Sequence, residues 1–184
     1  MFQSRATHLF SLFLITAVFV GALLVLNRPT FSATESIGKL DKADEDAARA
    51  VVMGIEQTWN SHDMDAMGKL FREDAEWINI VGMHWVGRDA IMVAHTAFHK
   101  TSFKNCNMKT DSIELRSIAD GCAVAVVTTT MDSFITPAGN VIPKGQDRLT
   151  YVLTKRSDGW RISHGHNVQV NAEAAQHNPV NAPK

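Results

Sequence analysis

The sequence predicts an α+β fold in which three helices pack on a strongly curved, mostly antiparallel sheet. Two observations lead to this prediction. Apolar residues recur at helical spacing over much of residues 41–100. Runs rich in β-branched residues then follow one another over residues 108–170, separated by short turns. Helices followed by a meander of long strands are typical of α+β domains.

The first predicted helix covers residues 41–60, where apolar residues recur every three or four positions up to Trp59. Its first turn is acidic, which satisfies free backbone amides and suits the positive end of the helix dipole. The run 60–63 (NSHD) breaks this helix, and a short apolar stripe over residues 64–71 predicts a second one. A third helix follows Gly87. Its apolar face consists of Ile91, Ala94, His95 and Phe98.

Five strands account for most of the remaining domain. An early run, AEWINIVG, is rich in β-branched and aromatic residues. The other four runs are longer, and turns at Asp120-Gly121, residues 137–140 and residues 157–159 separate them. The predicted strands cover residues 75–82, 108–118, 122–134, 146–155 and 160–170.

The amino-terminal segment has the layout of a secretory signal. Residues 9–26 hold 15 apolar residues among 18 and no charge, and Arg5 precedes them. The apolar stretch just reaches the length of a spanning helix, and small-x-small cleavage signals at residues 30–34 are weak. Residues 1–33 are therefore predicted to be a signal peptide or an uncleaved amino-terminal anchor. Either case predicts an exported protein, periplasmic or secreted. Such a protein would contact a membrane only if the leader remains attached, and then only through residues 9–26.

The composition excludes several classes of protein. The net charge of −1 lacks the basic excess of a nucleic-acid-binding protein, so no nucleic acid is expected as a partner. An apolar share of 45% excludes global disorder. Removing residues 1–33, which hold two arginines and no acidic residue, changes the net charge from −1 to −3. This charge favours a small-molecule ligand over nucleic acid.

The rest of the chain divides into a linker, one domain and a tail. Residues 34–40 form the linker, and residues 41–170 hold all the predicted helices and strands. Residues 171–184 are mostly small or polar and include prolines, which predicts a flexible tail.

The two cysteines are predicted to be free, buried thiols. If residues 108–118 and 122–134 form a hairpin, Cys122 lies at its turn and Cys106 at its far end. About 35 Å then separates them at ~3.3 Å per residue, whereas bridged Cα atoms lie within about 7 Å of each other.

Short matches spread over residues 41–170 resemble a known family. The opening helix with the strand after it, the Gly-Arg-x-x-Ile step of the third helix and the last strand resemble SnoaL-like domains. Their order is most similar to the SgcJ/EcaC group of the nuclear-transport-factor-2-like superfamily, which has a cystatin-like fold. The last strand also resembles that of the association domain of calcium/calmodulin-dependent kinase. The matching residues are Trp59, His62, Asp63, Phe71, residues 75–79, Gly82, Gly87, Arg88, Ile91, residues 158–162, His164 and His166.

The resemblance implies a cone: three helices packed on the curved sheet, with an internal pocket open at one end. Members include isomerases, dehydratases and polyketide cyclases, as well as proteins that only bind small molecules or dimerise. A homodimer is therefore expected. The chain departs from the steroid-isomerase pattern, because no aspartate lies on the inward face of the early strand and Tyr151 is the domain's one tyrosine.

Two histidines in the last strand are the candidate catalytic groups. Alternation places His164 and His166 on the strand face that also holds Ile162 and Val168. If these apolar neighbours mark a buried face, both imidazoles project inward, where a neutral ring acts as an acid or a base. The alternatives are a pair of hydrogen-bonded core histidines and a dimer surface.

Polar residues on two other strands are further candidates. Arg148 and Thr150 share one face of their strand, with Asp147 on the other. An inward Arg148 would hold a carboxylate or an enolate oxygen, and a solvated strand end is the alternative. Asn79 is a lone polar group on an apolar face, where it either satisfies neighbouring backbone or orients a ligand.

Three more residues complete the predicted pocket. Trp59 is expected in the core, Trp85 at the pocket rim, and His95 on the apolar stripe of the third helix. His95 and His99 have the spacing of a zinc-binding pair, and His95 with the two strand histidines could form a three-histidine site. The glutamate of the metalloprotease motif is absent, since Thr96 follows His95. The prediction is therefore a pocket histidine and no metal.

Two functions from different classes fit these residues. In the first, a small apolar or amphipathic molecule enters the pocket, His164 or His166 moves a proton, and Arg148 or Asn79 steadies the developing oxyanion. This is cofactor-independent isomerase, cyclase or dehydratase chemistry. In the second, the pocket binds a ligand without turnover, or the sheet serves as an association surface. The sequence contains no phosphate loop, nucleophile elbow or dinucleotide fingerprint, so no cofactor is expected.

Overall fold

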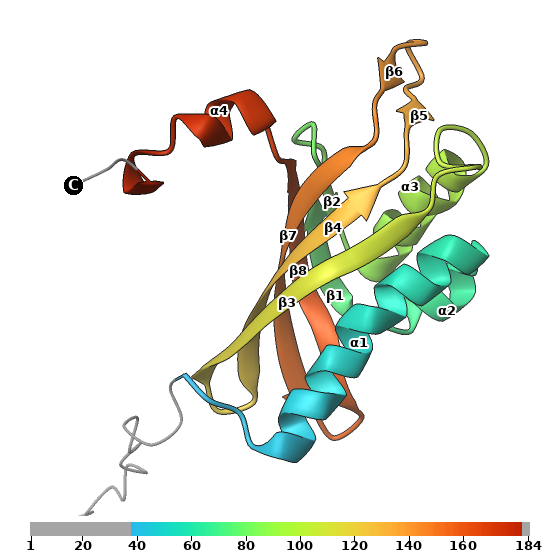
Figure 1. The fold of residues 1–184 in the computed structure, drawn as a ribbon. Helices are drawn as coiled ribbons and strands as arrows, with labels where there is room; N and C mark the ends of the chain where they lie inside the picture. The colour runs from blue at the N-terminus through green and yellow to red at the C-terminus, as the bar shows by residue number, and fades with distance from the viewer. Residues whose placement is uncertain (1–37, 182–184) are drawn as a thin grey trace, which may run out of the picture. The chain divides into compact units, whose positions relative to one another are not determined.

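Three helices pack on one face of a six-stranded sheet in the computed structural model, which describes residues 38–181 (Figure 1). This arrangement confirms the predicted α+β fold. A fourth, short helix follows the last strand, where the sequence predicts a tail, and all its residues are exposed. The helices are α1 (Lys42–Ser61), α2 (Met64–Gly68), α3 (Arg88–His99) and α4 (Ala172–Gln176), with a 3-10 turn at Pro179–Asn181.

Helix α1 begins and ends at capping groups that the sequence supplies. The Asp41 carboxylate accepts a hydrogen bond from the backbone amide of Asp44 at 2.8 Å, which satisfies a free amide of the first turn. At the other end, His62 adopts a left-handed conformation (φ 56°), and its amide donates to the carbonyls of Thr58 and Trp59. The buried side chains of α1 recur every three or four residues. They are Ala48, Val52, Ile55 and Trp59.

The strands are β1 (Phe71–Ile78), β2 (His84–Val86), β3 (Met108–Ala119), β4 (Cys122–Met131), β5 (Phe134–Ile135), β6 (Val141–Ile142), β7 (Gly145–Arg156) and β8 (Gly159–Gln169). The main sheet has the order β2-β1-β8-β7-β4-β3, in which β1 and β8 run parallel and the other neighbours are antiparallel. Strands β5 and β6 form a separate hairpin. The sequence predicts neither β2 nor β6 as a strand, because a strand of two or three residues shows too little alternation of apolar and polar residues.

A β-bulge in β8 reverses the alternation of its side chains. The adjacent β7 residues Val152 and Leu153 pair with His164 and Ile162, so Ser163 has no residue opposite it. We call the helix-covered face of the sheet the inner face and the opposite one the outer face. The inner face of β8 carries Trp160, Ile162, Gly165 and Asn167, and the outer face carries His164 and His166.

A charged cluster joins the β7–β8 turn to the start of β1. The buried guanidinium of Arg72 donates hydrogen bonds to the Asp158 carboxylate and to the carbonyls of Thr154 and Gly159. Asp158 also accepts a hydrogen bond from Arg161 at 3.0 Å. Hydrogen bonds from these two arginines lower the pKa of the Asp158 carboxyl to about 2. We call this the closed end of the domain.

The other end of the sheet carries two hairpins. A turn at residues 79–83 joins β1 to β2, and residues 136–140 join β5 to β6. Figure 1 shows both hairpins at the end of the sheet away from the β7–β8 turn. This is the open end of the domain.

The predicted leader at residues 1–33 lies outside the described residues. Within residues 38–181, no helix is both long and apolar enough to cross a bilayer. Both cysteines are free thiols, Cys106 buried and Cys122 half-buried, near opposite ends of the β3–β4 hairpin.

Candidate functional site

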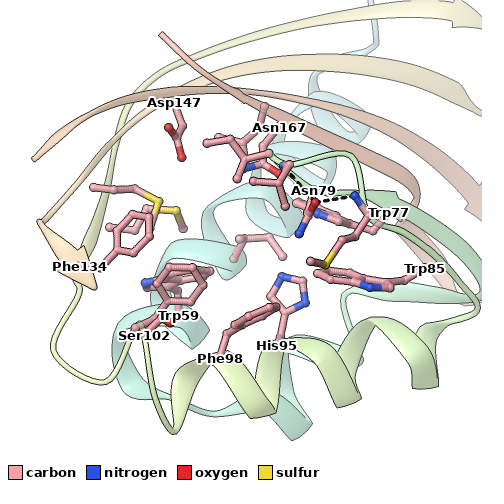
Figure 2. A pocket seen from close by; sticks show the side chains of 18 of the residues that line it. Trp59, Trp77, Asn79, Trp85, His95, Phe98, Ser102, Phe134, Asp147 and Asn167 are labelled. Atoms are coloured by element: carbon pink, nitrogen blue, oxygen red, sulfur yellow. Dashed lines mark hydrogen bonds between the residues drawn. The ribbon is translucent and has the colours of Figure 1, made fainter. Parts of the chain in front are cut away.

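A cavity of about 220 Å³ lies between the sheet and the helices at the open end (Figure 2). Rings surround His95 within it: the ring centres of Trp77 and Trp85 each lie 5.6 Å from that of His95. An apolar cavity of about 150 Å³ holds benzene, so this cavity has room for a molecule of one or two rings. The aromatic lining residues are Trp59, Phe71, Trp77, Trp85, Phe98, Phe103, Phe134 and Tyr151.

Four residues predicted for the pocket line this cavity: Trp59, Asn79, Trp85 and His95. The side-chain oxygen of Asn79 accepts hydrogen bonds from the backbone amides of Val81 (3.1 Å) and Met83 (2.8 Å), so Asn79 fixes the β1–β2 turn. Its amide nitrogen makes no hydrogen bond within residues 38–181. That nitrogen is free to donate to a ligand.

The other four predicted site residues lie on the outer face of the sheet: Arg148, Thr150, His164 and His166. The prediction that they project into the pocket is therefore wrong. In β8, the bulge at Ser163 moves both histidines to the outer face. In β7, the alternate residues Leu149 and Tyr151 are buried, which turns Arg148 and Thr150 outward. Arg148 is exposed, which agrees with the alternative that it lies at a solvated strand end.

Asp147, on the inner face of β7, supplies the one carboxyl group among the cavity's described lining residues. Its side chain is 7% exposed and has no hydrogen-bond or ion-pair partner within the described part of the chain. Burial raises the pKa of its carboxyl to about 6. Near neutral pH the group therefore occurs in both protonation states, which suits a group that exchanges protons with a ligand.

Two buried oxygen atoms near Asp147 also lack partners. Thr129 of β4 lies directly opposite Asp147, and its Oγ1 makes no hydrogen bond with any described residue. Asn167 of β8 pairs with Leu149, two residues from Asp147, and its Oδ1 has no partner in the same range. Buried polar atoms are seldom left unpaired. We call Thr129, Asp147 and Asn167 the Asp147 cluster. Asp147 and Asn167 line the cavity, where their free oxygens are suited to a polar group of a ligand.

His95 lies across the cavity from Asp147 in Figure 2. Its Nδ1 lies 2.8 Å from the carbonyl oxygen of Ile91. A carbonyl only accepts, so Nδ1 carries the proton, and Nε2 of the neutral ring holds a free lone pair. Burial lowers the pKa of His95, which keeps the ring neutral. His95 is therefore a hydrogen-bond acceptor in the cavity wall.

The cavity thus places polar groups on opposite walls with aromatic and aliphatic side chains between them. It is suited to a ligand with an apolar body and a hydroxyl or carbonyl group. Among the described residues, no cluster of three or more His, Cys, Asp or Glu side chains is placed to hold a metal ion. The three-histidine alternative is not formed, because His95 lies in the cavity and the two strand histidines lie on the outer face.

Asp147 was not predicted as a site residue, although a signal for it was present in the sequence. One face of β7 holds larger apolar side chains than the other, and the larger ones mark the buried face. The buried set is Asp147, Leu149, Tyr151 and Leu153, and the alternate set is Arg148, Thr150, Val152 and Thr154.

Comparisons with known proteins agree with this fold. The sequence model of the SnoaL-like domain matches residues 49–169. Among solved structures, an uncharacterized protein with a cystatin-like fold from Caulobacter vibrioides is 44% identical, with a TM-score of 0.73 over 75% of this chain and 97% of that one. A domain of unknown function from Nostoc punctiforme is 24% identical, with a TM-score of 0.63 over 75% of this chain and 84% of that one.

A third solved structure, a ketosteroid isomerase-like protein from Erwinia carotovora atroseptica, shares the fold at lower identity. It is 13% identical, with a TM-score of 0.59 over 72% of this chain and 99% of that one. None of the curated proteins compared with this chain matches it.

Proposed function

Because the chain belongs to the SnoaL-like domain family, we propose that its cavity binds a small apolar molecule and moves a proton on it. The ligand has one or two rings and a hydroxyl or an enolisable carbonyl group. Asp147 is the group that takes and returns the proton. The observation that carries this proposal is the buried Asp147 carboxyl, which has no partner within residues 38–181 and lies beside two unpaired oxygens.

The chemistry follows from the protonation of Asp147. With a pKa of about 6, most of the carboxyl groups are ionised at neutral pH and accept a proton from a ligand carbon beside a carbonyl. The carboxylic acid so formed returns the proton to another ligand atom. Return to a second carbon is an isomerisation, and return to a departing hydroxyl is a dehydration. The amide nitrogen of Asn79 donates to the ligand oxygen that gains charge, and Nε2 of His95 accepts from a ligand hydroxyl.

Binding is tested with naphthalene and 2-naphthol, which differ only in the hydroxyl group. We expect the full-length chain to bind 2-naphthol more tightly, because the hydroxyl meets the Asp147 cluster. Asp147→Leu reduces that preference roughly tenfold. Arg148→Gln, one residue away on the outer face, leaves both affinities unchanged. If neither molecule binds, the proposed cavity ligand is wrong.

Proton transfer is tested with 2-tetralone in deuterated water. We expect the protein to accelerate exchange of the protons beside the carbonyl, measured by NMR, and Asp147→Asn to lower the rate by roughly 10²-fold or more. Treatment with a chelator leaves the rate unchanged. Binding of 2-naphthol without accelerated exchange would contradict the catalytic part and assign the alternative function, a binding domain without turnover.

Association through the outer face of the sheet is a second proposed function. Half-exposed apolar side chains on this face support it: Val124 pairs with Val152 across β4 and β7, and Val126 lies two residues along β4. A face of this kind fits a second copy of the chain, and a homodimer is our proposal. Sedimentation equilibrium of the full-length chain tests it. Val126→Glu should give monomers and Asp147→Asn should not, whereas a monomeric wild-type protein would contradict the proposal.

Export is also a proposal, and it rests on the apolar run at residues 9–26 with Arg5 before it. Cell fractionation with amino-terminal sequencing tests it. A chain that starts near residue 33 outside the cytoplasm indicates a cleaved signal, and an intact chain in the membrane fraction indicates an anchor. A full-length chain in the soluble cytoplasm would contradict export. The net charge of −3 beyond residue 33 gives no support for a nucleic-acid partner.

A further inference from the structure

Two uncharged segments border the mouth of the cavity. The first is the β1–β2 turn, residues 79–83 (NIVGM), and the second is the β5–β6 hairpin with its flanks, residues 133–143 (SFITPAGNVIP). Charged residues make up 20% of the chain, yet neither segment contains one. We call these two segments the rim.

Apolar side chains of the rim are exposed to solvent. Val81 is 70% exposed and Val141 is 68% exposed, and Val141 pairs with the exposed Ile135 across the β5–β6 hairpin. Val81 and Met83 also line the cavity, as does Phe134. The apolar surface is therefore continuous from the solvent-facing tips of the rim into the cavity, and exposed apolar patches of this kind mark interaction sites.

Lysines adjoin the β5–β6 side of the rim. Lys104 borders the same surface hollow as Ile135 and Val141. Lys144 directly follows the rim segment and pairs with Asp132 at 3.0 Å. Asp132 balances the charge of Lys144, whereas Lys104 has no ion-pair partner among the described residues and leaves positive charge beside the apolar tips. A bilayer with anionic headgroups offers the complementary order, since its charged surface covers an apolar interior.

We propose that the rim docks on a lipid bilayer that carries anionic headgroups. The side chains of Val81 and Val141 enter the bilayer, and Lys104 faces the headgroup phosphates. Docking brings the cavity mouth against the acyl chains, so an apolar molecule passes between the bilayer and the cavity without crossing water. This last step rests on the proposed small-molecule function, whereas the docking itself does not.

The arrangement of the rim favours a bilayer over a protein partner. Figure 1 shows its two hairpins as separate projections at the open end. Because the cavity opens between them, a rigid protein surface seated on both hairpins would close its mouth. A fluid bilayer surrounds each projection and leaves the path into the cavity open.

Site-specific fluorescence tests the insertion. The full-length chain with Cys122→Ser carries a nitrobenzoxadiazole label at Val81→Cys, at Val141→Cys or, as the matched control, at Val93→Cys, which is 71% exposed on α3. Vesicles contain phosphatidylcholine with brominated acyl chains, with or without phosphatidylglycerol. We expect the labels at 81 and 141 to shift to shorter wavelength and to be quenched, more strongly with phosphatidylglycerol. The label at 93 should not change.

The label reports local contact, so vesicle binding through another part of the chain leaves it unchanged. Unchanged emission at 81 and 141 in the presence of vesicles would overturn the docking. A shift that appears without vesicles as the protein concentration rises would also overturn it, because a second copy would then cover the rim. The double variant Ile135→Asp/Val141→Asp, labelled at position 81, should lose most of the spectral shift and quenching, a readout that membrane binding through residues 9–26 does not affect.

Measuring 2-naphthol affinity in the same samples separates the two proposals. Neither Ile135 nor Val141 lines the cavity, so the double variant should keep wild-type affinity for 2-naphthol. In the labelled proteins without this double substitution, absence of insertion at positions 81 and 141 together with normal 2-naphthol binding would contradict the docking alone. Insertion without 2-naphthol binding would contradict the small-molecule function and leave the docking supported.

Discussion

Asp147 and Asp158 lie near opposite ends of β7, and their surroundings act on the two carboxyl groups in opposite directions. Asp158, in the β7–β8 turn, accepts hydrogen bonds from Arg72 and Arg161, which lower its pKa to about 2. Asp147, in the cavity, has no partner within the described residues, and burial raises its pKa to about 6. The same strand therefore has an ion-paired carboxylate near one end and a carboxyl group without a described partner near the other.

This difference separates the part of the domain that stabilises the fold from the part that we propose binds a ligand. At the closed end, the chain itself supplies partners for the buried Arg72. At the open end, Asp147 and the side-chain oxygen of Asn167 stay unpaired, which costs stability. Proteins tolerate such a cost where a ligand supplies the missing partner.

The largest expected effect comes from breaking the closed end. Arg72→Met leaves two backbone carbonyls without their side-chain donor and removes one of the two arginines that donate to Asp158, so the free energy of unfolding should fall by about 4 kcal/mol. Urea unfolding at pH 7 measures this. Arg156→Met is the control: Arg156 pairs with Asp74 on the exposed surface, so its loss should cost below about 1 kcal/mol. Equal losses in the two variants would show that the closed end does not stabilise the fold as described.

Gly165 lies between the two ends of the sheet, opposite Tyr151. A Cβ built on Gly165 would overlap ring carbons of Trp77, which forms part of the cavity wall. Gly165→Ala should therefore lower the free energy of unfolding by about 3 kcal/mol through overpacking. At Gly145, a built Cβ meets nothing closer than 3.8 Å, so Gly145→Ala serves as the control and should cost little. A stable Gly165→Ala protein would contradict the packing of Trp77 on β8.

Replacing Asp147 should stabilise the protein above pH 6. The native carboxyl titrates near pH 6 and the unfolded one near 3.8, so the native state binds more protons between these values. Wild-type stability therefore falls as the pH rises from about 4 to about 6. Asp147→Asn avoids this loss and should gain about 3 kcal/mol at pH 8 and little at pH 4. Unfolding at pH 4, 6 and 8 measures the difference.

Asp158→Asn should show the opposite sign in the same measurement. The native pKa of Asp158 lies below its unfolded value of 3.8, so its contribution is present above that pH and is lost as the pH falls toward 2. Asp158→Asn should therefore be less stable than wild type at pH 8. A gain in stability for Asp158→Asn, or a loss for Asp147→Asn, would reverse the comparison between the two ends.

The smallest expected effect is that of the outer-face histidines. His164→Ala and His166→Ala should each change the free energy of unfolding by below about 0.5 kcal/mol, because both side chains are partly exposed. Exchange of 2-tetralone protons should stay at the wild-type rate. A large loss of the proton-exchange rate in either variant would show that a histidine of the last strand, and not Asp147, is the acid–base group.

The fold was predictable because its long elements bury one face in a regular pattern. The stripe that ends at Trp59 predicted α1, and the alternation of residues 122–131 predicted β4. The site was less predictable, because one extra residue, Ser163, reverses the face of every side chain after it in β8. The sequence of the last strand gives no direct sign of this bulge. Gly165 is informative only once Trp77 is known to pack against it.

A ¹³C NMR titration of the Asp147 carboxyl carbon tests the central claim most directly. Comparison with the spectrum of Asp147→Asn identifies its signal. We expect a midpoint near pH 6 in the free protein and a displaced midpoint when 2-naphthol is bound, while the Asp158 signal titrates near pH 2. A midpoint near 3.8 for Asp147, unchanged by 2-naphthol, would contradict the assignment of Asp147 as the buried acid–base group of the cavity.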